Sequence, residues 1–225
     1  CADEYWKSGR ETLMLKSLLF AAAIATLTVG STGAWAAGPR DELLVTSAWL
    51  AQHAADKDLV ILHVGTPDGY KAKHIPGAHL VGPNGLTVKS PEGLMTELPP
   101  PDDLRAELQS LGVSDRSRII VYSENDGIAR ATRIMLTLDA AGLGKQSSLL
   151  DGGLKGWEAD GHAVNAEAPA ATMVVLSPLK MQSRIVTADY VQSHLKAPGT
   201  TVIDARAPEF YSGEKPGIEG AVPGH

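Results

Sequence analysis

The polar residues best placed for chemistry follow the clearest strand pattern in the chain. Residues 118–122 read RIIVY, which predicts a buried strand, and Ser123, Glu124 and Asp126 come directly after it. In parallel α/β sheets, reactive groups lie at the carboxyl ends of strands, where loops lead into helices. The loop at 123–127 is therefore the expected position of a site. A serine hydroxyl there has no accessible low pKa, and the two carboxylates repel an anionic substrate.

Several kinds of chemistry are excluded or unsupported by residue types and spacing. Cys1 is the only cysteine, which excludes an internal disulfide and a thiolate metal cluster. Histidines and acidic residues do not follow zinc-ligand spacing, so no structural metal is expected. A phosphatase-like C-x5-R loop needs a cysteine at position 123 and an arginine one residue before Arg130. The net charge of −6, without a basic stripe, argues against a nucleic-acid partner.

The chain contains two copies of one pattern. Residues 45–70 align without a gap to residues 186–211 at a constant offset of 141. A repeat of this length predicts two similar domains rather than a solenoid, whose period is roughly 20–50 residues. The second copy stops at His225, before its counterpart of the 123–127 loop. The identical pairs are Val45/Val186, Thr46/Thr187, His53/His194, Pro67/Pro208 and Tyr70/Tyr211.

Apolar periodicity predicts alternating strands and helices. This alternation favours an α/β fold, a parallel sheet flanked by helices on both faces. Residues 66–78 are expected to form loops around a short turn, because they hold two prolines and two glycines. A linker is expected over 166–183, with a docking edge strand at 173–176. The predicted strands are 59–62, 118–122 and 148–150, and the predicted helices are 41–55, 103–111, 128–141 and 154–160.

The amino-terminal region has the pattern of a secretory signal peptide at residues 14–36. Lys16 supplies a positive charge, about a dozen apolar residues follow, and Ala34-Trp35-Ala36 matches a cleavage site. The apolar run is shorter than the ~20 residues of a membrane span. We therefore expect an exported, periplasmic protein that begins near Ala37 and has no membrane span when mature. Residues 1–13 precede the start at Met14 and are interpreted as upstream read-through.

Four motifs in order resemble the rhodanese sulfurtransferases in their tandem two-domain form. They are HIPGA at 74–78, the strand and loop that begin with Val121-Tyr122, LDGGLKGW at 150–157, and DAR at 204–206. The match covers residues 42–225. The resemblance implies one complete rhodanese-like domain at 42–165 and the start of a second at 184–225.

The family's chemistry uses a cysteine thiolate in the loop after the central strand. By resemblance, the thiolate takes a sulfane sulfur from thiosulfate or 3-mercaptopyruvate and passes it to a thiophilic acceptor, a thiol or cyanide. Ser123 occupies the nucleophile position in the first domain and cannot carry a persulfide, so residues 42–165 are expected to be non-catalytic. The catalytic cysteine is expected beyond His225, which makes the 225-residue fragment inactive. The resemblance implies no cofactor, and we expect a monomer.

The second copy keeps the D-x-R motif as Asp204 and Arg206, where the first copy has His63 and Gly65. By resemblance, Arg206 points into the active site and binds an anionic substrate, since a guanidinium fork matches thiosulfate oxygens or a carboxylate. Asp204 then orients Arg206 or fixes loop backbone. The other reading is a surface salt bridge of Arg206 with Glu209 or Glu214. The alternative function is a non-catalytic, exported binding module with the rhodanese fold.

Overall fold

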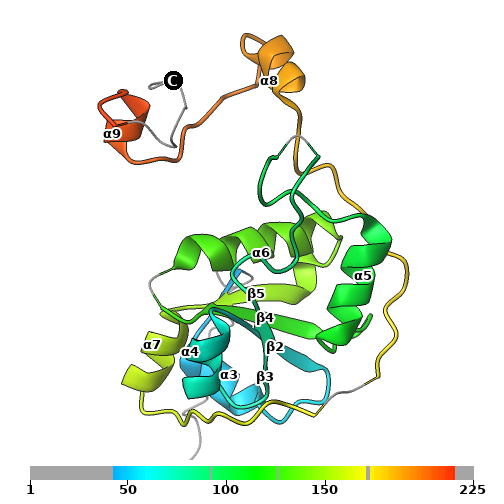
Figure 1. Ribbon diagram of the computed structural model, residues 1–225, viewed down its shortest axis with the longest axis vertical. Helices are drawn as coiled ribbons and strands as arrows, with labels where there is room; N and C mark the ends of the chain where they lie inside the picture. Colours follow the sequence, from blue (N-terminus) through cyan, green and yellow to red (C-terminus); the bar gives the residue numbers. More distant parts are fainter. Residues whose placement is uncertain (1–42, 92, 126, 171–172, 216–225) are drawn as a thin grey trace, which may run out of the picture. The chain divides into compact units, whose positions relative to one another are not determined.

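Five strands between Leu44 and Leu150 assemble into one parallel sheet. The computed structural model describes residues 43–91, 93–125, 127–170 and 173–215. The strand order is β1-β5-β4-β2-β3, with every adjacent pair parallel (Figure 1). This confirms the predicted α/β class. The strands are β1 Leu44–Val45, β2 Leu59–Val64, β3 Ala78–Val81, β4 Arg118–Ser123 and β5 Ser147–Leu150.

Helices cover both faces of the sheet, because alternate residues of the central strands point to opposite sides. On one face, Val60 and Leu62 of β2 pack with apolar residues of α5 and α6. On the other, Ile61 and Ile120 pack with residues of α3 and α7 (Figure 1). These helices are α3 Ser47–His53, α4 Pro67–Ala72, α5 Pro101–Ser110, α6 Ile128–Ala140 and α7 Gly153–Ala159, with a 3-10 turn at Gly144–Gln146.

Three local predictions were wrong. Residues 44–45 lie in the predicted 41–55 helix but form β1, since they pair with Leu149 and Leu150 of β5. The predicted loop at 66–78 contains α4, which Thr66 caps by accepting a hydrogen bond from the Gly69 N–H. Residues 173–176 form no strand. Leu176 alone of that run is buried, and it joins the α5–α6 core.

The second repeat contains two short helices, α8 Ala188–His194 and α9 Pro208–Tyr211. Its residues 201–205, which align with part of β2, form no strand, and the side chains of Val202 and Ile203 are exposed. No helix within the described ranges is long and apolar enough to cross a membrane. The predicted signal peptide at 14–36 lies outside the described residues.

Candidate functional site

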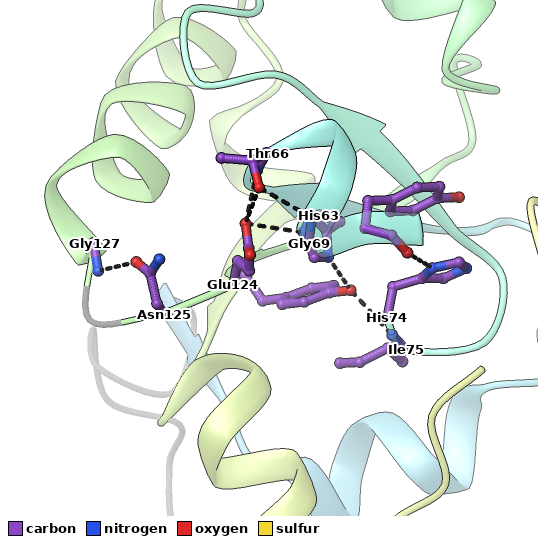
Figure 2. Close-up of polar contacts among 10 residues, drawn as sticks. His63, Thr66, Gly69, His74, Ile75, Glu124, Asn125 and Gly127 are labelled. Atoms are coloured by element: carbon purple, nitrogen blue, oxygen red, sulfur yellow. Dashed lines mark hydrogen bonds and ion pairs between the residues drawn. The ribbon is translucent and has the colours of Figure 1, made fainter. Parts of the chain in front are cut away.

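The predicted site lies at the carboxyl edge of the sheet, where β2 and β4 end side by side. Val64 of β2 pairs with Ser123 of β4. Gly65 and Thr66 follow β2, and Glu124 follows β4, so two loops that are far apart in sequence meet here (Figure 2). The parallel register therefore brings the 123–127 loop next to the start of α4, as the strand pattern predicted for a loop-borne site.

Ser123 is half-buried at the end of β4. Within the described part of the chain, no side chain forms a hydrogen bond with its hydroxyl, so none of those residues acts as a base for it. Gly153 of the 150–157 motif lies directly against it. A Cβ at Gly153 would lie 2.9 Å from the Ser123 carbonyl oxygen and 3.0 Å from Oγ, and the backbone there has φ of +55°. The glycine pair therefore allows the turn before α7 to approach the end of β4.

Glu124 does not extend into solvent as a simple repulsive charge. Its Oε2 accepts a hydrogen bond from the Thr66 backbone N–H at 2.7 Å and from the Thr66 hydroxyl at 3.3 Å (Figure 2). The carboxylate lies over the backbone of Gly65 and Gly69, where a Cβ would come within 2.3 Å and 1.7 Å of its oxygens. The Glu124 side chain is 21% exposed. A carboxylate thus occupies the space between the two loops.

His63, on the inner side of this carboxylate, is fully buried. Its Nδ1 lies 2.7 Å from the Tyr122 hydroxyl, which in turn accepts the Ile75 backbone N–H at 3.0 Å (Figure 2). Burial lowers the pKa of His63 to about 4, although Glu124 acts in the opposite direction. Burial also raises the pKa of Tyr122. Both groups are therefore neutral near pH 7.

His74 has a structural role. It is fully buried, its Nδ1 lies 2.7 Å from the Tyr70 carbonyl oxygen, and its Nε2 lies 3.0 Å from the Glu167 carbonyl oxygen. The ring stacks on Tyr70 with centroids 3.8 Å apart. Its backbone forms a β-bridge with Asn165. The 74–78 motif therefore ties the start of β3 to the segment that follows α7.

The structure brings the two predicted residues of the second copy together. Arg206 donates from Nε and Nη2 to the Asp204 carboxylate, at 2.9 Å and 2.6 Å, and the Arg206 backbone N–H also donates to it at 3.0 Å. The hydrogen bonds from Arg206 to Asp204 raise the pKa of Arg206. Glu209 instead pairs with Lys215 at 3.3 Å. Asp204 thus both orients the guanidinium and holds loop backbone, while the substrate-binding role of Arg206 stays a prediction.

Sequence reasoning noticed Glu124 but missed its partners, Thr66 and His63. The available signal was the repeat itself, because Gly65 and His63 stand where the second copy has Arg206 and Asp204. An arginine replaced by glycine leaves space beside the 123–127 loop, and a neighbouring long side chain can occupy it. In the described part of the chain, no three His, Cys, Asp or Glu side chains gather in a way that could hold a metal ion.

Together, a parallel sheet with a loop-borne site at its carboxyl edge and the motifs at 74–78 and 150–157 define an α/β domain of the rhodanese class. Residues 46–160 match the family model described as a rhodanese-like domain. The chain belongs to this family.

Named relatives share the family and extend beyond this chain. Thiosulfate sulfurtransferase from Pseudomonas aeruginosa is 32% identical over 185 residues, which cover 81% of this chain and 66% of the relative. Thiosulfate/3-mercaptopyruvate sulfurtransferase 1 from Arabidopsis thaliana is 28% identical, covering 81% of this chain and 57% of the relative. The crystal structure of SseA from Escherichia coli, titled as a 3-mercaptopyruvate sulfotransferase, has a TM-score of 0.67 at 27% identity, covering 80% of this chain and 72% of that one. The chain thus spans about two thirds of the bacterial relative's length.

Proposed function

We propose that this chain is part of a sulfurtransferase that moves a sulfane sulfur from thiosulfate or 3-mercaptopyruvate to a thiol or cyanide. Relatives that align with most of this chain carry these names. In the thiosulfate reaction, a cysteine thiolate attacks the outer sulfur, the S–S bond breaks, and sulfite leaves with the bonding electrons. Cyanide then attacks the outer sulfur of the persulfide, thiocyanate leaves, and the thiolate is regenerated.

The first domain does not carry out this chemistry, and one observation supports that conclusion above all. Ser123 occupies the position of the nucleophile, and the adjacent Glu124 carboxylate occupies the neighbouring space between the loops. A hydroxyl cannot form a persulfide, and a carboxylate repels thiosulfate. We therefore assign the reacting cysteine to the second domain, beyond His225. The first domain then serves as a structural partner.

Arg206 is the proposed donor-binding residue of that second domain. Its guanidinium uses Nε and Nη2 on Asp204, which fixes the plane of the group. The planar fork of a guanidinium matches the oxygens of a small oxyanion, which is the basis of the proposed role. The donor it binds is a small anion, either a thiosulfate or a carboxylate such as that of 3-mercaptopyruvate.

A sulfur-transfer assay tests the proposal. Thiosulfate-to-cyanide turnover is measured for residues 37–225 and for the product of the longer reading frame, purified in the same way. We expect turnover from the longer product alone, and its loss when the cysteine after the second domain's central strand is changed to serine. Turnover by residues 37–225 would contradict the assignment of the catalytic site to the second domain.

One observation favours a second function, a non-catalytic binding module: the complete domain at 42–165 contains no thiol. Serine or aspartate at the corresponding position of the second domain would support the module and exclude the enzyme. Under either function we propose export to the periplasm, from the signal-peptide pattern at 14–36. Periplasmic fractionation and the mass of the mature amino terminus, expected at Ala37, test this export.

A further inference from the structure

We propose that Glu124 is a tethered ligand, whose carboxylate fills and closes a small-oxyanion site between the loops after β2 and β4. This site belongs to the first domain and is separate from the proposed catalytic site of the second. The closure holds whichever reaction the whole protein catalyses. It predicts that the native first domain does not bind small oxyanions at this position, and that removing the Glu124 carboxylate lets them in.

Three polar hydrogens face the carboxylate. The Thr66 N–H donates at 2.7 Å and the Thr66 hydroxyl at 3.3 Å, both to Oε2. His63 Nε2 lies 3.9 Å from the same oxygen, which is too far for a hydrogen bond. Because all three point at one oxygen from the protein side, they form a cradle that suits any compact oxyanion rather than glutamate alone (Figure 2).

The hydrogen-bond network indicates which nitrogen of His63 carries the proton. Tyr122 accepts the Ile75 N–H, and His63 Nδ1 is the acceptor that lies within reach of its own hydrogen. The Glu124 carboxylate, 3.9 Å from Nε2, also favours a hydrogen on that nitrogen. The neutral ring therefore carries its hydrogen on Nε2, facing Glu124. This Nε2 is fully buried and has no hydrogen-bond partner. An unpaired buried donor costs free energy, and an anion seated deeper than the Glu124 carboxylate would satisfy it.

The backbone beneath the carboxylate provides space that only glycine allows. A Cβ on Gly65 would lie 2.3 Å from Glu124 Oε2 and 2.4 Å from His63 Nε2, and one on Gly69 would lie 1.7 Å from Glu124 Oε1. Removing the Glu124 side chain therefore opens a space bounded by the Thr66 and His63 donors. Gly65 aligns with Arg206 of the second copy. The two copies thus carry opposite charges at this position. The second copy has the Arg206 guanidinium, which suits an anion, and the first copy has the Glu124 carboxylate.

A cavity of about 310 Å³ adjoins the carboxylate, and Asn125 and Arg130 are among its lining residues. Among the described lining residues, Glu124 carries the negative charge and Arg130 the positive one. Without the Glu124 carboxylate, the Arg130 guanidinium and the Thr66 N–H remain, and both favour an anion. The ligand class is a small oxyanion, and sulfate, thiosulfate and acetate share the required acceptor oxygens.

Titration calorimetry of Glu124→Ala against sulfate and against thiosulfate tests the closure. Glu124→Gln is the matched control, since an amide of the same shape keeps the cavity filled without the charge. We expect the alanine variant to bind both anions at least about tenfold more tightly than the native chain, while the glutamine variant gains little. Equal affinities in all three proteins would overturn the proposal, as would a glutamine variant that gains as much as the alanine variant.

A second measurement does not depend on a folded variant. In the native chain at neutral pH, the amide proton of Thr66 is observed by NMR. Because this N–H donates to a carboxylate oxygen at 2.7 Å, its resonance should lie downfield of amides that donate to water. A Thr66 amide proton at the position of a solvent-exposed amide would contradict the cradle. Should the alanine variant be unstable, sulfate should raise its thermal midpoint more than that of the native chain.

Discussion

The two copies of the repeat share their helices but not their strand. In both, a threonine caps the helix, and a histidine stacks on an aromatic ring one turn earlier. The ring centroids of Trp49 and His53 lie 4.0 Å apart, as do those of Tyr190 and His194. In each pair the histidine Nδ1 lies within 2.8 Å of the carbonyl oxygen of its aromatic partner. These contacts span three or four residues, so each copy forms them unaided.

The two copies differ in whether the aligned segment forms a strand. Residues 59–64 form β2, which lies between β4 and β3 and is almost entirely buried. Residues 201–205 follow the same pattern but form no strand, and Val202 and Ile203 are 59% and 81% exposed. A strand needs neighbours for its backbone hydrogen bonds, whereas a short capped helix forms its own. The same sequence pattern therefore gives a helix locally and a strand only within a sheet.

The largest expected effect comes from alanine substitutions at one aligned pair of strand positions. Leu62 in the core of β2 corresponds to Ile203 in the second copy. Leu62→Ala should lower the free energy of unfolding by about 2–5 kcal/mol, because it leaves a cavity in the core. Ile203→Ala should change it by less than about 0.5 kcal/mol, since the side chain is exposed. Urea unfolding of both variants measures the difference, and similar losses would mean that Ile203 is packed.

The next effect concerns His63, whose counterpart in the second copy is Asp204. The folded-state pKa of about 4 lies below the ordinary 6.5, mainly because the ring is buried. The unfolded chain therefore takes up a proton first as pH falls, so the contribution to stability is complete above pH 6.5 and is lost towards pH 4. That loss amounts to roughly 3 kcal/mol.

Urea unfolding at neutral pH and near pH 4 measures this loss. His63→Gln should flatten the acid slope of stability. It should not remove the slope, because burial also lowers the pKa of His79, which the variant keeps. Parallel slopes for the native chain and the variant would show that folding does not lower the pKa of His63.

A smaller effect tests the shared caps. Thr46 accepts a hydrogen bond from the Trp49 N–H at 3.1 Å, and Thr187 accepts one from the Tyr190 N–H at 3.2 Å. Thr46→Ala should destabilise the domain by about 1 kcal/mol, because α3 packs on the sheet. Thr187→Ala should reduce the helicity of 188–194, seen in Cα chemical shifts, without moving the domain's thermal midpoint. Serine at either position should restore the cap, and a serine variant that behaves like alanine would argue against it.

The smallest effect on stability is expected at Arg206. The Arg206 side chain is 45% exposed, so Arg206→Ala should change the thermal midpoint of the chain very little. In the proposed two-domain sulfurtransferase, the same change should raise KM for thiosulfate, and Arg206→Lys should restore the charge but not the fork. An unchanged KM would remove Arg206 from the proposed donor site.

Patterns that span a few residues were enough for much of the fold. The apolar runs located β2 and β4, and the 128–141 periodicity located α6. The sequence pattern failed where contacts with distant residues, or an unusual combination of residues, determine the secondary structure. Two residues became β1 because β5 pairs with them, and α4 was missed because Thr66, Pro67 and Gly69 together make a helix start from residues typical of loops.

The site follows the same division. The position of the 123–127 loop and the lack of a thiol could be predicted, because both depend on residue type and on strand order. The contact between Glu124 and Thr66 joins residues 58 apart in sequence, and the burial of His63 depends on Tyr122 and on the register between β2 and β4. Neither contact can be predicted from the residues next to it in the sequence. Only the substitution of Gly65 for the repeat's arginine indicates that space is available there.

Amide hydrogen exchange across the aligned segments 59–64 and 201–205 tests the central claim most directly, because it reports the strand in each copy within one sample. The account predicts that β2 amides exchange at least about a thousandfold more slowly than unstructured peptide, and that those of 201–205 exchange nearly as fast as it. Strong protection at Val202 and Ile203 would contradict the account, because it would mean that the second copy has built its strand within this chain.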